Sequence, residues 1–326
     1  MFRVRVILRW TALCLVAIGI LAPCIWWLTK GYRPTRIAVI PRTCGTLLWE
    51  GEHVGVARAA RALGYEIYWN APLREDDVQS QIGLVQKVMR KRYAGLILAP
   101  QQSRPLMTTV VGLEQRGIPV VIVGTELNVD PGSRLGYVLS DEHMAGEMAA
   151  RQVAQKLHGH GTVALVGINR TLSSLSDRCN SFEHVIGKDY PDIHVVWRSS
   201  AHMNAAEEQQ EIERMIVEHS RVDAIVALNE SSTRGAYYAL SDLRQAGSVV
   251  LVGFDQDMMS QLRHGGVDAL IMQDTNRMGT EAVKMMYAQL HGGSSHPVVI
   301  VPPFLATRDT MHSAEYERMV NLVWFQ

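Results

Sequence analysis

Three apolar segments in the second half of the chain each stop at a side chain that can form several hydrogen bonds. They cover residues 222–228, 249–254 and 267–272, and the residues that close them are Asn229, Asp255 and Gln273. A fourth apolar segment, residues 161–169, is soon followed by Arg178. A carboxylate accepts hydrogen bonds from hydroxyls, a guanidinium group donates them and an amide does both. This chemistry favours a small polar ligand that carries many hydroxyls, such as a sugar.

The positions of these side chains depend on what the apolar segments form. Segments this rich in β-branched residues, separated by amphipathic stretches of helix length, are typical of parallel strands buried between helix layers. In such sheets, ligands bind beyond the carboxyl ends of the strands. The alternative for each residue is a structural one, because an Asp or Asn at a strand end often caps the following helix.

The alternation of strand and helix runs through most of the chain. Strands are predicted at residues 36–40, 66–70, 94–100 and 118–124, with a further strand that leads into a helix over residues 137–157. Between them lie predicted helices at residues 49–63 and from about Asp76, the latter with Val78, Ile82, Val85 and Met89 on one face. The alternation restarts at Gly161 and continues to about Leu290, and residues 297–308 form a last extended stretch. Two such runs predict two doubly wound α/β domains with a ligand cleft between them.

Composition narrows the function. The 326 residues include 32 Lys and Arg and 32 Asp and Glu, so the net charge is zero. A nucleic-acid-binding protein needs a basic face, so this balance argues against nucleic acid as a partner. Of the four cysteines, Cys14 and Cys24 lie in an N-terminal apolar run, and the remaining Cys44 and Cys179 are too few for a disulfide framework.

The N-terminal run itself predicts export. Residues 10–29 carry no charge and follow three arginines, and about 20 apolar residues are enough to span a bilayer as a helix. Trp26 and Trp27 stand where an aromatic belt would lie. We therefore expect a retained membrane anchor, with a cleaved signal peptide or a lipoprotein signal at Cys24 as alternatives. All three place the following residues in the periplasm or at the outer face of the inner membrane.

From about Ile37 to Arg308, the chain resembles the periplasmic ribose- and galactose-binding proteins and the ligand-sensing half of lac-repressor-type regulators. The motifs that carry this resemblance are IAVI at 37–40, ARALGYEI at 60–67, the GLILAP strand, SDEHMAG at 140–146, DRCNSF at 177–182, ALNE, VGFDQD and IMQD. The resemblance implies the type I periplasmic-binding-protein fold, with two parallel-sheet domains joined by three hinge crossings. The implied division is an N-terminal segment 1–35, a first lobe of 36–140 plus 274–302, and a second lobe of 141–273 plus 303–326.

The resemblance also implies a ligand site. In the second lobe and at the hinge, Arg178, Asn229, Asp255 and Gln273 occupy positions that hold sugar hydroxyls in the family. The first lobe departs from the family pattern: Thr46, Leu48 and Trp49 stand where an Asn and two Phe are found. An Asp-Arg pair is replaced by Gly124 and Thr125, followed by Glu126.

Three side chains are the candidates that compensate for this departure. Trp49 can stack on the C–H face of a pyranose or pack within its helix. Glu126 can replace a lost hydroxyl ligand or remain a solvated loop carboxylate, and Met203 can supply an apolar wall. The departure leaves open which sugar binds and whether the ligand is a sugar.

These observations predict an exported solute-binding protein that delivers its ligand to an ABC-type importer, with no cofactor and no catalytic residues. A membrane-tethered sensor that presents the closed state to a signalling partner is the alternative. A lac-repressor-type transcriptional regulator is a weaker alternative, since a membrane-length segment stands where its DNA-binding domain would be. An enzyme is disfavoured because no nucleophile–base pair or metal cluster is visible in the sequence.

Overall fold

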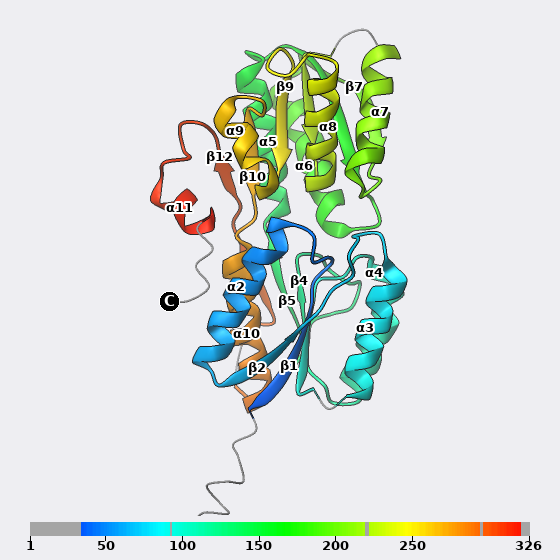
Figure 1. Ribbon diagram of the computed structural model, residues 1–326, viewed down its shortest axis with the longest axis vertical. Helices are drawn as coiled ribbons and strands as arrows, with labels where there is room; N and C mark the ends of the chain where they lie inside the picture. The colour runs from blue at the N-terminus through cyan, green and yellow to red at the C-terminus, as the bar shows by residue number, and fades with distance from the viewer. Residues whose placement is uncertain (1–33, 92, 219–221, 294–295, 321–326) are drawn as a thin grey trace, which may run out of the picture. The chain divides into compact units, whose positions relative to one another are not determined.

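Buried β-branched strands form two six-stranded sheets in the computed structural model, which describes residues 34–91, 93–218, 222–293 and 296–320 (Figure 1). The first sheet has the order β11-β5-β4-β3-β1-β2. Its strands are β1 (Thr35–Ile40), β2 (Tyr65–Trp69), β3 (Gly95–Leu98), β4 (Val120–Val123), β5 (Leu135–Ser140) and β11 (Val298–Val301). The pairs β1–β3, β3–β4, β4–β5 and β5–β11 are all parallel.

The second sheet repeats this plan with the order β12-β10-β9-β8-β6-β7. Its strands are β6 (Gly161–Ile168), β7 (Ile193–Ser200), β8 (Ala224–Ala227), β9 (Val250–Phe254), β10 (Ala269–Met272) and β12 (Phe304–Ala306). All of its pairs are parallel except β10–β12, which is antiparallel. The predicted extended stretch 297–308 is therefore two strands, β11 in one sheet and β12 in the other. Pro302 and Pro303 separate them, since proline cannot donate to a sheet ladder.

Helices cover both faces of each sheet, as expected for strands that are apolar on both sides. On the first sheet, α2 (Leu47–Ala62) and α10 (Thr275–His291) cover one face, and α3 (Val78–Arg90) and α4 (Ser103–Gln115) cover the other (Figure 1). Successive residues of β1 point to opposite faces of the sheet. Val39 packs against α2 and α10, whereas Ile40 packs against α3 and α4. The predicted doubly wound α/β fold is confirmed.

The second sheet is covered in the same way. One face packs against α5 (Glu142–Lys156) and α6 (Ser173–Asp189), and the other against α7 (Ala205–Glu218), α8 (Glu230–Asp242), α9 (Met259–His264) and α11 (Ala314–Val320). A short 3₁₀ helix, η1 (Gln256–Met258), follows β9. The chain passes between the layers of the two sheets three times: from β5 to α5, from β10 to α10, and from β11 to β12.

Residues 36–326 belong to one compact unit. The N-terminal apolar run, for which a membrane anchor is predicted, lies outside the described residues. Among the residues that the structure describes, no helix is both long enough and apolar enough to cross a membrane.

Glycines set the distance between α2 and α10, the two helices that begin beside the carboxyl ends of β1 and β10. A Cβ atom at Gly55 would lie 2.0 Å from the backbone oxygen of Asn276. One at Gly51 would lie 2.4 Å from the Thr275 hydroxyl oxygen, which itself donates to the Leu48 carbonyl at 2.8 Å. Only glycine permits this contact, so the approach of α2 to α10 depends on both positions.

We therefore expect Gly55→Ala to destabilise the protein by about 1–3 kcal/mol, the usual cost of overpacking a buried contact. The added methyl group meets a backbone atom that cannot rotate away. Gly83→Ala in α3 is the matched control, since a Cβ atom there has no neighbour within 4 Å. It should stabilise the protein by about 0.5–1 kcal/mol, because alanine is the better helix former. Urea unfolding of both variants measures the difference, and equal midpoints would contradict the prediction.

Candidate functional site

The carboxyl ends of strands from both sheets surround a small space, called here the central cavity. Its volume is about 30 Å³. Side chains that follow strands of the first sheet line one side, with Arg42, Trp49 and Glu75 among them, and Glu142 lies at the crossing from β5. The other side is lined from the second sheet by Arg178, Met203, Asn229, Glu230, Asp255 and Gln273. Six of the eight predicted ligand residues therefore lie around one space.

Arg178 is the most firmly held of these side chains. It is 2 % exposed, its Nε atom donates to Glu142 Oε2 at 2.7 Å, and its Nη2 atom lies 2.5 Å from the same oxygen in an ion pair. Its Nη1 atom donates to the Leu228 carbonyl at the end of β8, and its guanidinium carbon lies 3.8 Å from the centre of the Phe254 ring. Burial raises the pKa of Glu142, and the neighbouring Arg178 guanidinium counteracts this rise. The fork of Arg178 is thus largely occupied by protein partners.

Asp255 has an unusual backbone. Its φ of 68° and ψ of −177° lie in a region that glycine adopts far more readily, and such a conformation costs about 1–3 kcal/mol. The residue is 3 % exposed, and Gln273 Nε2 donates to its Oδ1 atom at 3.1 Å. Burial raises the pKa of this carboxyl against the opposing effect of Arg178. The backbone conformation places the carboxylate on the wall of the central cavity.

Asn229 caps the helix that follows it, which is the structural alternative predicted for residues at strand ends. Its Oδ1 atom accepts from the Ser232 backbone N–H at 2.9 Å and so caps α8, while its Nδ2 atom donates to the Gly167 carbonyl at 3.2 Å. Gly167 has a φ of 81°, and a Cβ atom there would lie 2.6 Å from Asn229 Nδ2. Asn229 therefore lines the cavity with both polar atoms already paired, so that any ligand contact is an additional one.

The first lobe supplies an aromatic ring and charges. Trp49 is 4 % exposed, and the guanidinium carbon of Arg42 lies 5.8 Å from its ring centre. Arg42 Nε donates to the Pro100 carbonyl at 3.0 Å. Burial raises the pKa of Glu75, counteracted first by Arg42 and then by the Trp49 indole. Among the described residues, the Trp49 indole N–H has no hydrogen-bond partner at ordinary geometry. It nevertheless lies close enough to the Glu75 carboxyl to lower the pKa of that group.

Glu230 is a further buried acidic residue in the wall. It is 4 % exposed, and burial, followed by the nearby Asp257 carboxylate, raises its pKa to about 9. Its Oε1 atom lies 3.4 Å from Arg234 Nη1, and its Oε2 atom has no hydrogen-bond donor among the described residues. Asp257 also accepts from the Leu47 backbone N–H at 3.0 Å, a contact between the N-terminus of α2 and the second lobe.

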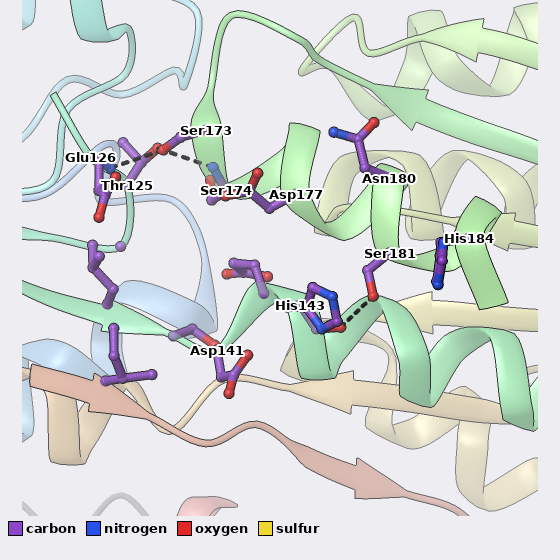
Figure 2. Close-up of a pocket in the computed structure, with 15 residues that line it drawn as sticks. Thr125, Glu126, Asp141, His143, Ser173, Ser174, Asp177, Asn180, Ser181 and His184 are labelled. Carbon is purple, nitrogen blue, oxygen red and sulfur yellow. Dashed lines mark hydrogen bonds between the residues drawn. The ribbon is translucent and has the colours of Figure 1, made fainter. Parts of the chain in front are cut away.

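A second space adjoins the central cavity beside the β5–α5 crossing and is called here the hinge-side cavity. Its volume is about 660 Å³, and it shares Glu142 and Ser174 with the central cavity. Figure 2 shows Thr125 and Glu126 facing the N-terminus of α6: Thr125 Oγ1 and the Glu126 backbone N–H both lie 3.0 Å from Ser173 Oγ. Glu126 itself is exposed and lies in this space, not in the central cavity.

A third space, the outer cavity, adjoins the central cavity on another side. Its volume is about 340 Å³, and it shares Glu75, Met203 and Glu230 with the central cavity. Of the three cavities, Thr46 lines only the outer one. Its hydroxyl oxygen is buried and has no hydrogen-bond partner within the described residues. Of the predicted set, therefore, Thr46 and Glu126 are the two residues that do not line the central cavity.

The sequence prediction missed four charged residues of the central cavity: Arg42, Glu75, Glu142 and Glu230. Three of them stand, like Asp255, just after the end of a strand, the feature that identified Asp255 in the sequence. Arg42 follows β1 by two residues, Glu142 follows β5 by two, and Glu230 follows Asn229 directly. Glu75 lies in the longer connection between β2 and α3, for which strand ends give no guide.

Comparisons with known proteins agree with this geometry. Residues 37–294 match the family model described as a periplasmic binding protein domain. A D-apiose import binding protein from Paraburkholderia graminis is 24% identical over 262 residues, which cover 79% of this chain and 82% of that protein. A xylitol-binding protein from Mycolicibacterium smegmatis is 25% identical over 284 residues, with coverage of 86% and 79%.

The fold also matches solved structures. An ABC transporter solute-binding protein from Agrobacterium vitis, solved with α-D-tagatopyranose bound, superimposes with a TM-score of 0.82 at 22% identity. The match covers 87% of this chain and 98% of that one. Because the family model covers residues 37–294, most of both sheets and the crossings from β5 and β10, the chain belongs to the periplasmic binding protein family, which the sequence resemblance predicted.

Proposed function

We propose that this protein captures a small hydroxyl-rich ligand, of the sugar or polyol class, in the central cavity and delivers it to an ABC-type importer. The observation that carries the proposal is the convergence of carboxylate, guanidinium and amide side chains from both lobes on one buried space. Such groups pair with hydroxyls in the way that sugar recognition requires. The names of the curated relatives, which bind D-apiose and xylitol, support the same ligand class. Membership of this family implies a periplasmic location and a binding rather than a catalytic role.

Binding requires the lobes to move. A cavity of about 30 Å³ holds little more than one or two water molecules, whereas ligand pockets usually measure about 300–1,000 Å³. We infer that residues 36–140 with 274–302 and residues 141–273 with 303–326 move as two lobes about the three crossings. A ligand can favour closure only through contacts that differ between the open and closed states, so it must touch both lobes.

Asp255→Asn tests the site. It keeps the shape of the side chain and removes the charge, so affinity should fall by about 1.5–3 kcal/mol, the range for hydrogen bonds to a charged group. The measurement is isothermal titration calorimetry against a panel of D-ribose, D-allose, D-arabinose, D-galactose, xylitol and myo-inositol. Asp255→Gly should bind as weakly but unfold at a higher urea concentration, because glycine relieves the backbone strain.

Asp189→Asn is the control for this experiment, since Asp189 is exposed at the end of α6 and lies outside all three cavities. Unchanged affinity in Asp255→Asn would remove this residue from the site. If the wild-type protein binds no sugar or polyol, whatever its number of carbon atoms or sugar units, the proposed function is contradicted.

Ser173→Ala tests closure. Ser173 Oγ lies 3.0 Å from Thr125 Oγ1 and from the Glu126 backbone nitrogen, so it joins the two proposed lobes, and we expect these contacts to break when the lobes open. Each lost hydrogen bond should weaken the apparent affinity by about 0.5–1.5 kcal/mol. Solution scattering should show a smaller radius of gyration with ligand than without, and a larger radius for unliganded Ser173→Ala than for wild type. Ser248→Ala, in an exposed turn of the second lobe, is the control. Scattering curves that superimpose with and without ligand would exclude hinge closure.

The N-terminal run supports a tether. We propose that residues 10–29 stay in the inner membrane as an uncleaved anchor, because an uncharged stretch of this length inserts stably as a helix. A permanent anchor also favours the second candidate function, a sensor whose closed state is read by a membrane partner. Intact mass of the mature protein should correspond to the full chain, from Met1 or Phe2. A mass that begins after about residue 20 would establish cleavage, and a lipidated Cys24 would establish a lipoprotein.

A further inference from the structure

The central cavity has an excess of negative charge. Its wall includes four carboxylates, Glu75, Glu142, Glu230 and Asp255, and two guanidinium groups, Arg42 and Arg178. When all six groups are ionised, the wall carries two negative charges more than positive ones. Neutral hydroxyls can donate to carboxylates, but they cannot compensate a net charge in a buried space.

The two arginines are already committed to other partners. Arg178 donates to Glu142 Oε2 and to the Leu228 carbonyl and forms an ion pair with Glu142, and Arg42 donates to the Pro100 carbonyl. In the described part of the chain, the only cation within 4 Å of Glu230 is Arg234, at 3.4 Å, and Arg234 also lies 3.8 Å from Asp257. Arg234 therefore pairs only with Glu230 Oε1 and is shared with Asp257, so Glu230 has no cation to itself.

Within the part of the chain that the structure describes, two buried carboxylate oxygens in the wall lack a hydrogen-bond donor. They are Oε1 of Glu142 and Oε2 of Glu230, in side chains that are 6 % and 4 % exposed. An unpaired oxygen of a buried carboxylate is costly, and it is relieved when a charged donor arrives. Burial, followed by the nearby Asp257 carboxylate, raises the pKa of Glu230 to about 9, so this carboxyl group holds a proton at pH 7 and releases it when a cationic donor binds.

We propose that the ligand of the central cavity carries a cationic amino group beside its hydroxyls, and that Glu230 is the carboxylate that receives this group. The chemical class is an amino sugar or another hydroxylated primary amine. An ammonium group would supply three donors to a wall that holds two unpaired acceptors, and it would remove half of the excess charge. The inference rests on the proposed function, because it names the ligand class of the same site.

The test compares matched ligands that differ at one position. Calorimetry at pH 7 uses sets of a neutral sugar, its amino counterpart and the N-acetylated form, such as D-galactose, D-galactosamine and N-acetyl-D-galactosamine, with equivalent sets for glucose and mannose. In at least one set, the amino sugar should bind at least tenfold more tightly than the neutral sugar, and N-acetylation should abolish this preference. Acetylation removes the charge and keeps the nitrogen in place.

Glu230→Gln identifies the receiving carboxylate. It keeps the size of the side chain, and the preference for the amino sugar over the neutral sugar should fall below about threefold. Glu66→Gln is the control, since Glu66 is half exposed on β2 and lies outside the cavities. Urea unfolding of both variants verifies that they fold.

Three outcomes would overturn the inference. If neutral sugars bind and their amino counterparts bind no better, the proposed function stands and the cationic ligand is wrong. If Glu230→Gln keeps the full preference, another group receives the amine. If no sugar of any kind binds, the proposed function fails and this inference fails with it.

Discussion

The ion pair between Arg178 and Glu142 connects the elements on which the cleft depends. Glu142 opens α5 directly after the crossing from β5, and Arg178 lies in the second turn of α6. The same guanidinium group bonds to the end of β8 and stacks on Phe254 at the end of β9. One buried side chain therefore fixes two helices and two strand ends around the central cavity. Removal of one partner from such a pair typically costs about 3–5 kcal/mol, because the remaining charge stays buried.

Local packing makes this ion pair possible. A Cβ atom at Gly146 of α5 would lie 2.3 Å from the Arg178 backbone oxygen and 2.9 Å from Ser181 Cβ. Glycine at this position lets α5 and α6 approach closely enough for Glu142 to reach Arg178. The approach of α2 to α10 in the first lobe depends on glycine in the same way. Each lobe thus places a helix N-terminus beside the cavity by means of a contact that any side chain would prevent.

The sequence was sufficient to predict the two sheets and the edge where ligand residues gather, because both follow from apolar periodicity and strand direction. It could not show which hydrogen-bonding atoms are already used. Asn229 has the right type and position, yet both of its polar atoms pair within the protein. Thr46 and Glu126 follow the correct strands but face neighbouring cavities, since the direction of a loop after a strand is decided by tertiary contacts.

The missed carboxylates have a different cause. Glu142 and Glu230 each follow a residue that also caps its helix: Asp141 accepts from the Met144 N–H, and Asn229 accepts from the Ser232 N–H. In an acidic pair or an Asn-Glu pair at a helix start, sequence alone favours a capping role for both residues. The structure separates them, because the first residue caps and the second turns towards the cavity wall.

The crossings limit what kind of motion the lobes can make. A single residue, Asp141, separates β5 from α5, and two residues separate β10 from α10 and β11 from β12. Asp141 and Asp274 cap the helices that begin at two of these crossings, and Asp274 also pairs with Arg318 of α11 at 2.6 Å. In the proposed hinge motion, connections this short and this well bonded favour rotation over sliding of the sheets. They leave rotation about a few backbone angles, which opens the cleft on the side away from the crossings. In this proposed motion, the outer cavity, which Thr46 and Glu230 line, becomes the expected entrance for the ligand, and Asp255, which lines the central cavity but not the outer one, is among the last groups that the ligand meets.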